Sequence, residues 1–201
     1  ARIASAVDVP MKTRCRLSTN IASGILHTVS EMNASEVVMG LHHKHGLLDS
    51  FLGTFTQSLL KGTNRQLMIV KSVIPPNLIR RIIVAVPPKA EYEAGFYKWI
   101  ERVARIGTQL GCRVHFWGHT DTIPRIEGYV NKFHHGVRAE YSFLDDWDDL
   151  LLLTGQVNYD HLLVIVSARK GSISYQASFE ELPNQITRYF SDNSLMLVYP
   201  D

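Results

Sequence analysis

Several features that mark common classes of protein are scarce or absent in the sequence. There are only two cysteines, Cys15 and Cys112, and neither lies in a CxxC or metal-binding spacing. Two isolated thiols are typical of a protein kept in a reducing cytosol, without a disulfide framework. The longest apolar runs, such as residues 82–86 and 161–166, have the length of strands, far below the roughly 20 residues of a membrane-spanning helix. No signal-peptide pattern opens the sequence, so we expect a membrane to be reached only through another part of the protein.

An excess of charge of one sign is also missing, and so are the familiar catalytic motifs. The formal net charge is +2, and the lysines and arginines are scattered along the chain, whereas a nucleic-acid-binding domain usually has a concentrated basic face. The sequence has no Gly-x-Ser-x-Gly elbow, no His-Glu-x-x-His motif and no Walker loop. We therefore expect neither a nucleic-acid partner nor enzymatic activity.

What the sequence does contain is an alternation of short apolar runs with longer amphipathic stretches. This alternation predicts βαβ units and a doubly wound parallel sheet of the α/β class. We expect strands at residues 13–17, 36–39, 66–71, 81–86, 113–117, 137–143, 161–166 and 195–199. We expect helices at residues 20–32, 50–61, 91–110, 123–134, 147–157 and 178–190. Asn20 is the expected N-cap of the first helix, and Gly62 and Gly111 are expected to end the second and third.

The parts of the chain before and after Pro75 and Pro76 end in the same way. Each finishes with an apolar strand, a long loop, a helix and a short strand. This shared layout predicts a tandem repeat. We expect residues 1–72 to be the C-terminal part of a first copy, residues 73–79 a linker, and residues 80–201 a complete second copy.

Residues 33–71 resemble the signature end of universal stress protein domains. The resemblance is carried by Val38-Met39-Gly40 at the end of a strand, by Gly53-Thr54 at the start of a helix, and by a strand that ends in the basic residue Lys71. It implies an adenine nucleotide alpha hydrolase-like fold, present as one partial and one complete copy. The complete copy should then have the strand order 3-2-1-4-5.

The same resemblance has consequences for the edges of the sheet. The partial copy retains only the last three strands, so its first strand, residues 13–17, should be displaced or completed by another chain. The strands that close the two copies, residues 67–71 and 195–199, should pair between domains or between the subunits of a homodimer, because an exposed apolar edge invites aggregation.

The resemblance also implies a nucleotide site in the first copy. Nucleotide-binding members of the family have Gly, two residues, Gly, nine residues, Gly, and then Ser or Thr. Gly40, Gly53 and Thr54 match this pattern, but His43 stands at the second glycine. Glycines and a helix N-terminus let backbone N–H groups approach a phosphate, whereas the Cβ of His43 crowds the phosphates or disfavours a positive φ. We expect a degenerate site for ATP or another adenine nucleotide, to which His43 could donate one hydrogen bond.

The second copy departs further from the nucleotide-binding pattern. Ser167 and Lys170 stand at its first two glycine positions, and Glu180 and Glu181 replace the Gly-Ser/Thr pair. The family's aspartate after the first strand is missing, because Pro87 follows Val86 there. We therefore expect the second copy not to bind ATP in the family's manner.

Tandem copies joined by a proline linker, with a divergent second copy, are similar to the cytoplasmic tails of bacterial sodium/proton antiporters. This likeness implies a regulatory domain at the cytoplasmic face of the inner membrane, attached to the membrane transport domain of the same polypeptide. Three alternatives stay open: a ligand-free dimerisation or assembly tail, a free-standing tandem universal stress protein, and a nucleotide hydrolase of the same superfamily.

Three further groups of residues are candidate sites. Arg169, Lys170 and Ser172 follow a strand, where they could hold an anion such as a phosphate-bearing signal molecule or simply form an exposed basic loop. The histidines of residues 42–45 have no Cys or acidic residue nearby, which favours a solvated loop over a metal site. The acidic run at residues 145–149 starts a predicted helix, where Asp is favoured by capping and by the helix dipole.

Overall fold

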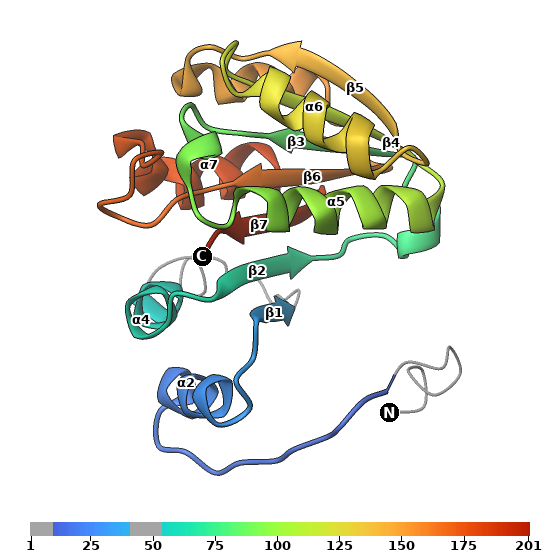
Figure 1. The fold of residues 1–201 in the computed structure, drawn as a ribbon. Helices are drawn as coiled ribbons and strands as arrows, with labels where there is room; N and C mark the ends of the chain where they lie inside the picture. The colour runs from blue at the N-terminus through green and yellow to red at the C-terminus, as the bar shows by residue number, and fades with distance from the viewer. Residues whose placement is uncertain (1–9, 41–53) are drawn as a thin grey trace.

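Seven strands form a single mixed, mostly parallel sheet in the computed structural model, which describes residues 10–40 and 54–201 (Figure 1). Their order across the sheet is β1-β2-β7-β6-β3-β4-β5, and every neighbouring pair is parallel except β2 and β7. The strands are β1 (Glu36–Gly40), β2 (Gln66–Lys71), β3 (Arg81–Ala85), β4 (Arg113–Gly118), β5 (Arg138–Phe143), β6 (His161–Val166) and β7 (Ser194–Tyr199).

The order of the last five strands confirms the prediction for a complete unit. Taken in chain order, β3 to β7 lie as 3-2-1-4-5 across the sheet. The expected pairing of the two closing strands is made within the chain, where β2 runs antiparallel to β7 with Ile69 opposite Leu197. The sheet is therefore continuous from β1 at one edge to β5 at the other.

Helices cover both faces of the sheet and create two apolar cores. On one face lie α5 (Phe96–Leu110) and α6 (Ile123–Phe133), in front of the strands in Figure 1. On the other face lie α2 (Ile21–Glu31), α4 (Thr56–Gly62), the 3-10 helix η4 (Trp147–Gly155) and α7 (Leu182–Tyr189). Within the described ranges no helix combines the length and apolar character needed to cross a membrane.

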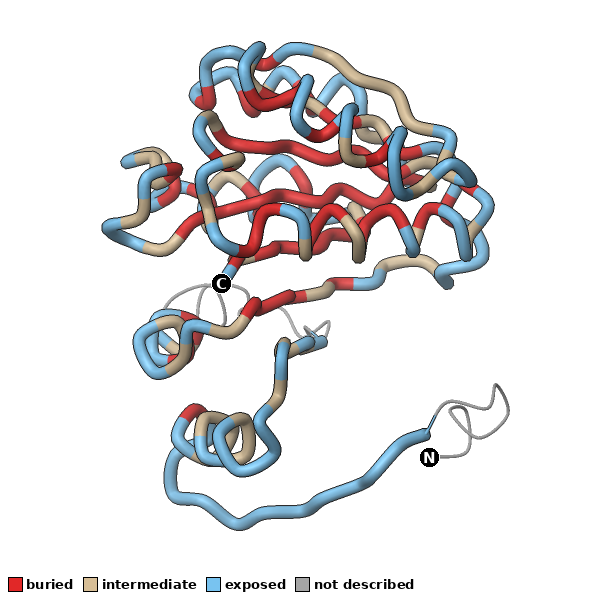
Figure 2. The backbone as a smooth tube through the Cα atoms, viewed as in Figure 1, coloured by how far each residue is buried: buried red, intermediate tan, exposed pale blue. Residues whose placement is uncertain are grey.

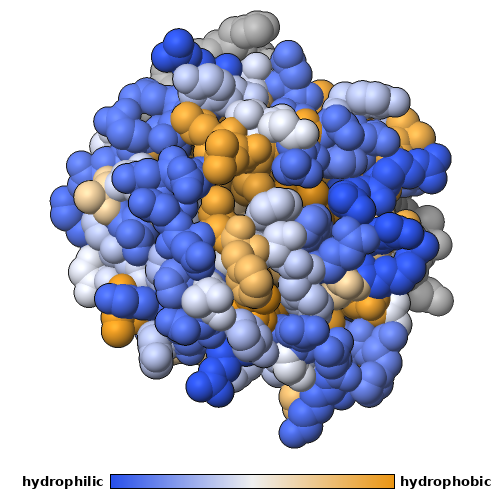
Figure 3. All heavy atoms as spheres, turned by 90° about the horizontal axis from the view of Figure 1, so that it is seen from above, coloured by the Kyte–Doolittle hydropathy of each residue, from blue (hydrophilic) through white to orange (hydrophobic). Residues whose placement is uncertain are grey.

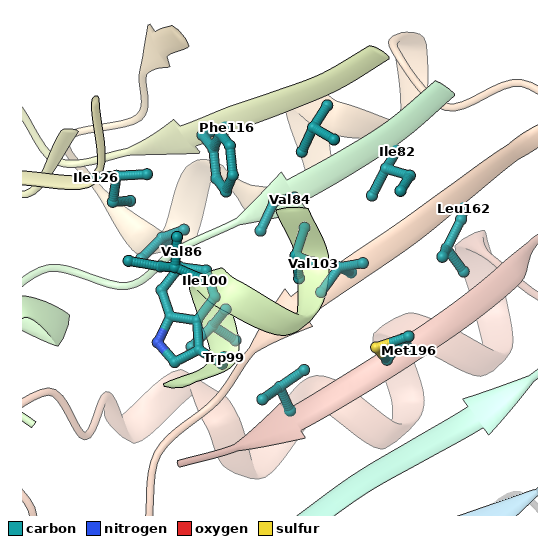
Figure 4. Packing of buried hydrophobic residues seen from close by; sticks show 14 of the residues in the cluster. Ile82, Val84, Val86, Trp99, Ile100, Val103, Phe116, Ile126, Leu162 and Met196 are labelled. Atoms are coloured by element: carbon teal, nitrogen blue, oxygen red, sulfur yellow. The ribbon is translucent and has the colours of Figure 1, made fainter. Parts of the chain in front are cut away.

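The two central strands explain why both cores form. All six residues of β6 are buried, as is usual for a parallel strand covered on both faces. On β3, Ile82 and Val84 face α5, whose Trp99 and Val103 pack over them (Figure 4). Alternate residues of the same strand enter the core on the opposite face. Burying each large apolar side chain contributes about 1.5–3 kcal/mol to the free energy of folding.

All three predicted boundary residues lie at the ends of their helices, and one of them, Gly62, has a further role in packing. The Asn20 side chain accepts a hydrogen bond from the backbone N–H of Ser23, 3.1 Å away, and caps α2. Gly111 ends α5 in the left-handed conformation, with φ of 63°. Gly62 is the last residue of α4, but unlike Gly111 it does not have a positive φ. A Cβ at this position would come within 2.2 Å of a methyl of Leu26 on α2, so this glycine allows two helices to pack closely.

Three helical predictions need correction. Residues 147–157 form the 3-10 helix η4 rather than an α-helix. Residues 178–190 are divided into the 3-10 turn η5 (Ala177–Glu181) and α7, because Pro183 lies in the first turn of α7, where a residue without an N–H is tolerated. The helix expected from residue 91 begins at Phe96, after the turn η3 (Ala90–Tyr92). The predicted linker contains one more short turn, η2 (Pro76–Leu78).

Residues 13–17, predicted to be a strand that is displaced or completed by another chain, lie apart from the sheet (Figure 1) and form no strand in the described part of the chain. These residues pair with no other strand and are exposed, and the side chain of Leu17 is 99% accessible. Figure 1 shows the segment running outside α2, apart from the sheet. Arg14 and Arg16 both form ion pairs with Glu31 on α2. A strand needs a neighbour to receive its backbone hydrogen bonds, and this segment lies beside a helix.

The sheet ends in β5 on the side opposite β1. Seen from this side, the surface is mostly hydrophilic and is crossed by an apolar band (Figure 3). Glu140 on β5 accepts hydrogen bonds from Arg81 and Arg113, at 2.9 Å and 3.0 Å. Charged side chains on an edge strand discourage pairing with another chain.

Candidate functional site

The predicted nucleotide site lies at the carboxyl end of β1. Gly40 is the last residue of β1 and is exposed, and a Cβ added there would meet no atom within 4 Å. Thr54 is also exposed and lies just before α4, where its carbonyl accepts a hydrogen bond from the Ser58 hydroxyl at 2.8 Å. The other two predicted residues, His43 and Gly53, lie outside the described residues. The structure thus places the two ends of the predicted motif in open positions.

The corresponding place in the rest of the sheet is the carboxyl ends of β3 and β6, where the strand order reverses. Ligands of open α/β sheets bind at such a point, between the loops that follow the two strands. Here the two loops are tied together: Ser174, 1% exposed, donates its N–H and its hydroxyl to one oxygen of Glu93, at 2.9 Å and 2.6 Å. A cavity that Glu93, Arg169 and Ser172 help to line beside them has a volume of about 10 Å³, about enough for one water molecule.

Arg169, predicted as an anion ligand, bonds to backbone carbonyls in this structure. Its guanidinium donates to the carbonyls of Leu60 and Thr63 at 2.8 Å, of Arg65 at 2.7 Å and of Pro200 at 3.1 Å. Three of these carbonyls belong to the end of α4 and the approach to β2, where helix carbonyls lack partners and favour a cation. Burial lowers the pKa of Arg169, and Asp201 opposes that shift. Arg169 therefore joins the loop after β6 to the segment between α4 and β2.

Lys170 and Ser172, the other two predicted anion ligands, also have partners. The Lys170 ammonium lies 3.1 Å from a carboxylate oxygen of Glu180, which also accepts from the Tyr175 hydroxyl. This hydrogen bond raises the pKa of Lys170 and lowers that of Glu180. Ser172 donates to the carbonyl of Arg169 at 2.9 Å. The anion site stays a prediction, in which an incoming anion has to compete with Glu180.

Comparisons with known proteins bear on the fold. No family model matches the chain, and no curated protein matches it. A universal stress protein from Archaeoglobus fulgidus DSM 4304 aligns with 100% of this chain and 73% of its own, at 13% identity and a TM-score of 0.64. A functionally unknown protein from Pseudomonas aeruginosa PAO1 aligns with 100% of this chain and 75% of its own, at 14% identity and a TM-score of 0.62. The chain has the universal stress protein fold.

The universal stress protein fold extends over both parts of the chain, since the alignments cover all of it. The resemblance found in residues 33–71 therefore identified the fold correctly. At these identities the likeness concerns the fold, and the chemistry of this chain has to be judged from its own residues. Among the described residues, Gly40 and Thr54 are exposed, whereas the loops after β3 and β6 are joined by the hydrogen bonds between Ser174 and Glu93.

The sequence analysis did not predict a groove between α4 and α7, which lie on the same face of the sheet. Its volume is about 660 Å³. It is lined by Gln57 and Lys61 of α4, Tyr175 in the loop after β6, and Pro183 and Ile186 of α7. These residues come from distant parts of the chain, and they meet because β2 and β7 are adjacent strands. No local sequence signal could have brought them together.

A polar cluster on β4 and β5 was missed as well. The Nε2 atom of His115 lies 2.8 Å from the Ser142 hydroxyl, and its Nδ1 atom lies 3.7 Å from Glu140. Burial lowers the pKa of His115, although the Glu140 carboxylate opposes the shift. The alternation within each strand could have placed these side chains on one face, but the register that sets His115 opposite Glu140 is visible only in the sheet.

Proposed function

We propose that this chain is a non-catalytic regulatory domain with a tandem arrangement of the universal stress protein fold. In this proposal residues 1–72 are the C-terminal part of a first copy, residues 73–79 a linker, and residues 80–201 a complete second copy. The domain is the cytoplasmic tail of a sodium/proton antiporter, and its partner is the membrane transport domain of the same polypeptide.

The repeat is supported by the symmetry around the β2–β7 pair. Strand β1, helix α4 and strand β2 form a parallel unit, and so do β6, α7 and β7. Leu59 of α4 and Ile186 of α7 enter the same core on the same face of the sheet. Two such units that meet through antiparallel closing strands are related by a local twofold axis, as two copies of one domain would be.

A regulatory role is supported by the contrast between the carboxyl end of β1 in the first copy and the carboxyl ends of β3 and β6 in the second copy. The Ser174–Glu93 hydrogen bonds close the point where a complete copy would take a ligand, whereas Gly40 and Thr54 remain exposed. This contrast is the observation that carries the proposal. The first copy binds ATP or another adenine nucleotide through Gly40, His43, Gly53 and Thr54, and the second copy provides a rigid support.

Calorimetric titration of ATP, with and without magnesium, tests the nucleotide site. We expect binding that weakens in Thr54→Val, which removes a hydroxyl at nearly constant volume, and that is unchanged in the control Thr187→Val on the exposed side of α7. Binding that Thr54→Val leaves intact would contradict the site. The absence of heat would favour a ligand-free assembly tail, and the release of ADP in proportion to protein would favour a hydrolase.

The transport partner requires a separate test. The natural polypeptide that contains this chain is reconstituted in vesicles, and sodium-driven proton flux is measured with the chain intact and with it deleted. We expect the flux to persist in the deletion but to lose its dependence on ATP. A polypeptide without membrane-spanning segments would contradict the antiporter and favour a free-standing tandem universal stress protein.

The proposal includes a homodimer formed through edge strands. Strands β2 and β7 pair with each other within the chain, so such a dimer has to use β5 or β1. Light scattering on the chain over a range of concentrations measures this association directly, and a constant monomer mass would contradict it.

A further inference from the structure

The groove between α4 and α7 lies where the two parts of the chain meet. Helix α4 comes before Pro75 and Pro76, and α7 comes after them, yet both helices contribute to the same apolar core over β2 and β7. The volume of the groove, about 660 Å³, is within the range of pockets that hold drug-sized ligands. Both parts of the chain have to be in place for this space to exist.

The accessible walls of the groove are largely apolar. Leu60 of α4, Pro183 of α7 and the Tyr175 ring are only half-buried. The floor beneath them includes Leu197 of β7, which is 1% exposed. Tyr175 packs edge-on against Phe179, with ring centroids 5.7 Å apart, and this contact fixes one wall. An apolar ligand in the groove would bury the remaining accessible surface of these side chains, which favours its binding.

The charged side chains that line the groove are mostly cationic. Lys61, Arg169 and Lys170 are among its lining residues, and the only carboxylate among those that the structure describes is that of Glu180. Lys61 lies in the last turn of α4, where it has no ion-pair partner within the described residues. Lys170 is paired with Glu180, but both side chains are exposed, and such a pair contributes little to stability. Lys170 is therefore able to turn to an incoming anion.

Arg169 removes an obstacle to an anion at this place. The carbonyls at the C-terminal end of a helix carry the negative end of its dipole and repel anions. The Arg169 guanidinium donates to the carbonyls of Leu60 and Thr63, each at 2.8 Å, so the end of α4 is compensated by a positive charge. The neighbouring Lys61 is then an uncompensated cation at the rim of an apolar groove.

We propose that this groove is a binding site for a small amphipathic anion. The apolar body of the ligand packs against Leu60 and Pro183, and its acidic group, a carboxylate or a phosphate monoester, binds Lys61 and Lys170. Because the ligand contacts both α4 and α7, it stabilises the contact between the two parts of the chain. The inference uses neither the nucleotide site nor the transport domain, so it holds or fails independently of the proposed function.

Fluorescence titration with 8-anilinonaphthalene-1-sulfonate, an aromatic probe with one sulfonate, tests the site. We expect saturable binding that Lys61→Gln weakens by about two- to five-fold, the size of the effect of a partly exposed ion pair. The matched control is Lys132→Gln, because Lys132 lies in the last turn of α6 on the other face of the sheet. Equal affinity of the two variants would overturn the proposal, and so would the absence of saturable binding.

An uncharged probe tests the position of the acidic group. N-phenyl-1-naphthylamine has the same rings without the sulfonate, and it should bind the unaltered chain and Lys61→Gln equally well. A similar loss of affinity for both probes would show that Lys61→Gln acts on the shape of the groove, which would overturn the role of Lys61 as the ligand of the acidic group.

Competition identifies the chemistry of the ligand. Octanoate and octyl phosphate should displace the sulfonate probe, and the stronger competitor identifies the preferred acidic group. Failure of both to displace the probe would overturn the proposal. ATP should leave the probe bound, whereas displacement by ATP would assign the probe to the nucleotide site instead of the groove.

Amide hydrogen exchange locates the bound probe without any substitution. At a saturating concentration of the sulfonate probe, amides of α4 and α7 should exchange at least about three-fold more slowly, and amides of α6 should change less. Slower exchange that leaves α4 and α7 unaffected would place the probe elsewhere and overturn the site.

Discussion

The parts of the sheet on the two sides of the β2–β7 pair use the same kinds of elements but are buried to different extents. Strands β1 and β6 are both apolar, yet β6 is buried throughout and Val38 of β1 is 60% exposed (Figure 2). Likewise Phe96 and Trp99 on α5 are at most 1% exposed, whereas Ile21 on α2 is 72% exposed. The difference lies in the neighbours: among the strands that the structure describes, β6 has one on each side and β1 has one in all. Burial is thus decided by topology more than by the composition of a strand.

The largest difference between the two parts is expected from deletions of apolar side chains. Phe116 on β4 is fully buried and stacks with Tyr141, with ring centroids 5.8 Å apart. Phe116→Ala should lower the free energy of unfolding by about 3–5 kcal/mol. Val38→Ala removes a mostly exposed side chain and should cost less than about 0.5 kcal/mol. Urea unfolding followed by circular dichroism measures both, and equal losses would contradict the contrast.

The next largest effect concerns the contact between the two parts. Arg169→Met removes four hydrogen bonds to carbonyls of Leu60, Thr63, Arg65 and Pro200, and it should cost about 2–3 kcal/mol, because the partly buried carbonyls lose a charged donor. Hydrogen exchange should accelerate in residues 59–71 and stay slow in β3 and β4.

The control for this substitution is Lys170→Met. The Lys170 side chain is 80% exposed and its ion pair is with the exposed Glu180, and such pairs contribute little to stability. If the two variants lose the same stability, or if exchange accelerates uniformly, Arg169 does not join the two parts in the way its hydrogen bonds indicate.

A smaller effect distinguishes two glycines inside helices. Gly62→Ala places a Cβ within 2.2 Å of Leu26, and displacing that side chain should cost about 1 kcal/mol. Gly128 in α6 has no atom near an added Cβ, so Gly128→Ala should stabilise by about 0.5 kcal/mol through helix propensity alone. Thermal unfolding of both variants gives the signs, and Leu26→Ala combined with Gly62→Ala should recover part of the loss.

The smallest expected effect is a dependence of stability on pH that arises from two histidines of the complete unit. Burial lowers the pKa of His115 and of His161 in the folded chain. Both imidazoles therefore bind protons more readily in the unfolded chain, so their contribution to stability is full above the unfolded pKa, near 6.5, and is lost as the pH falls through the folded pKa. Unfolding titrations between pH 7.5 and 5 should show this loss, and His115→Gln should reduce it. An unchanged slope would contradict the assignment.

Much of the local structure was predictable from the sequence, because it depends on neighbouring residues. The apolar run at residues 161–166 is β6 with the predicted limits. Asn20 caps the start of α2 and Gly111 ends α5, both through contacts within a single turn. Features that depend on distant partners were harder to predict: residues 13–17 form no strand in the described part of the chain, and Gly62, which ends α4 as predicted, also packs against Leu26 of another helix. In each of these cases a contact from another element decided the outcome.

The candidate site also has features that the sequence could indicate and features that only the structure reveals. The resemblance of residues 33–71 implied a nucleotide site that includes Gly40 and Thr54. Both residues are exposed in the structure, and the site stays a prediction. No spacing in the sequence indicated that Arg169 would bond to carbonyls near α4, more than a hundred residues earlier in the chain.

The sequence by itself determined the class of fold and the positions of most strands, since alternating apolar runs allow few ways to build a parallel sheet. The order of the complete unit was implied by the resemblance of residues 33–71 to universal stress proteins. Only the tertiary structure decided which ends of the sheet are closed. Ser174 and Glu93 meet because two loops from adjacent strands converge, and β1 is an edge strand because, within residues 10–40 and 54–201, only β2 pairs with it. Both outcomes depend on contacts between residues far apart in the chain, which periodicity and spacing do not encode.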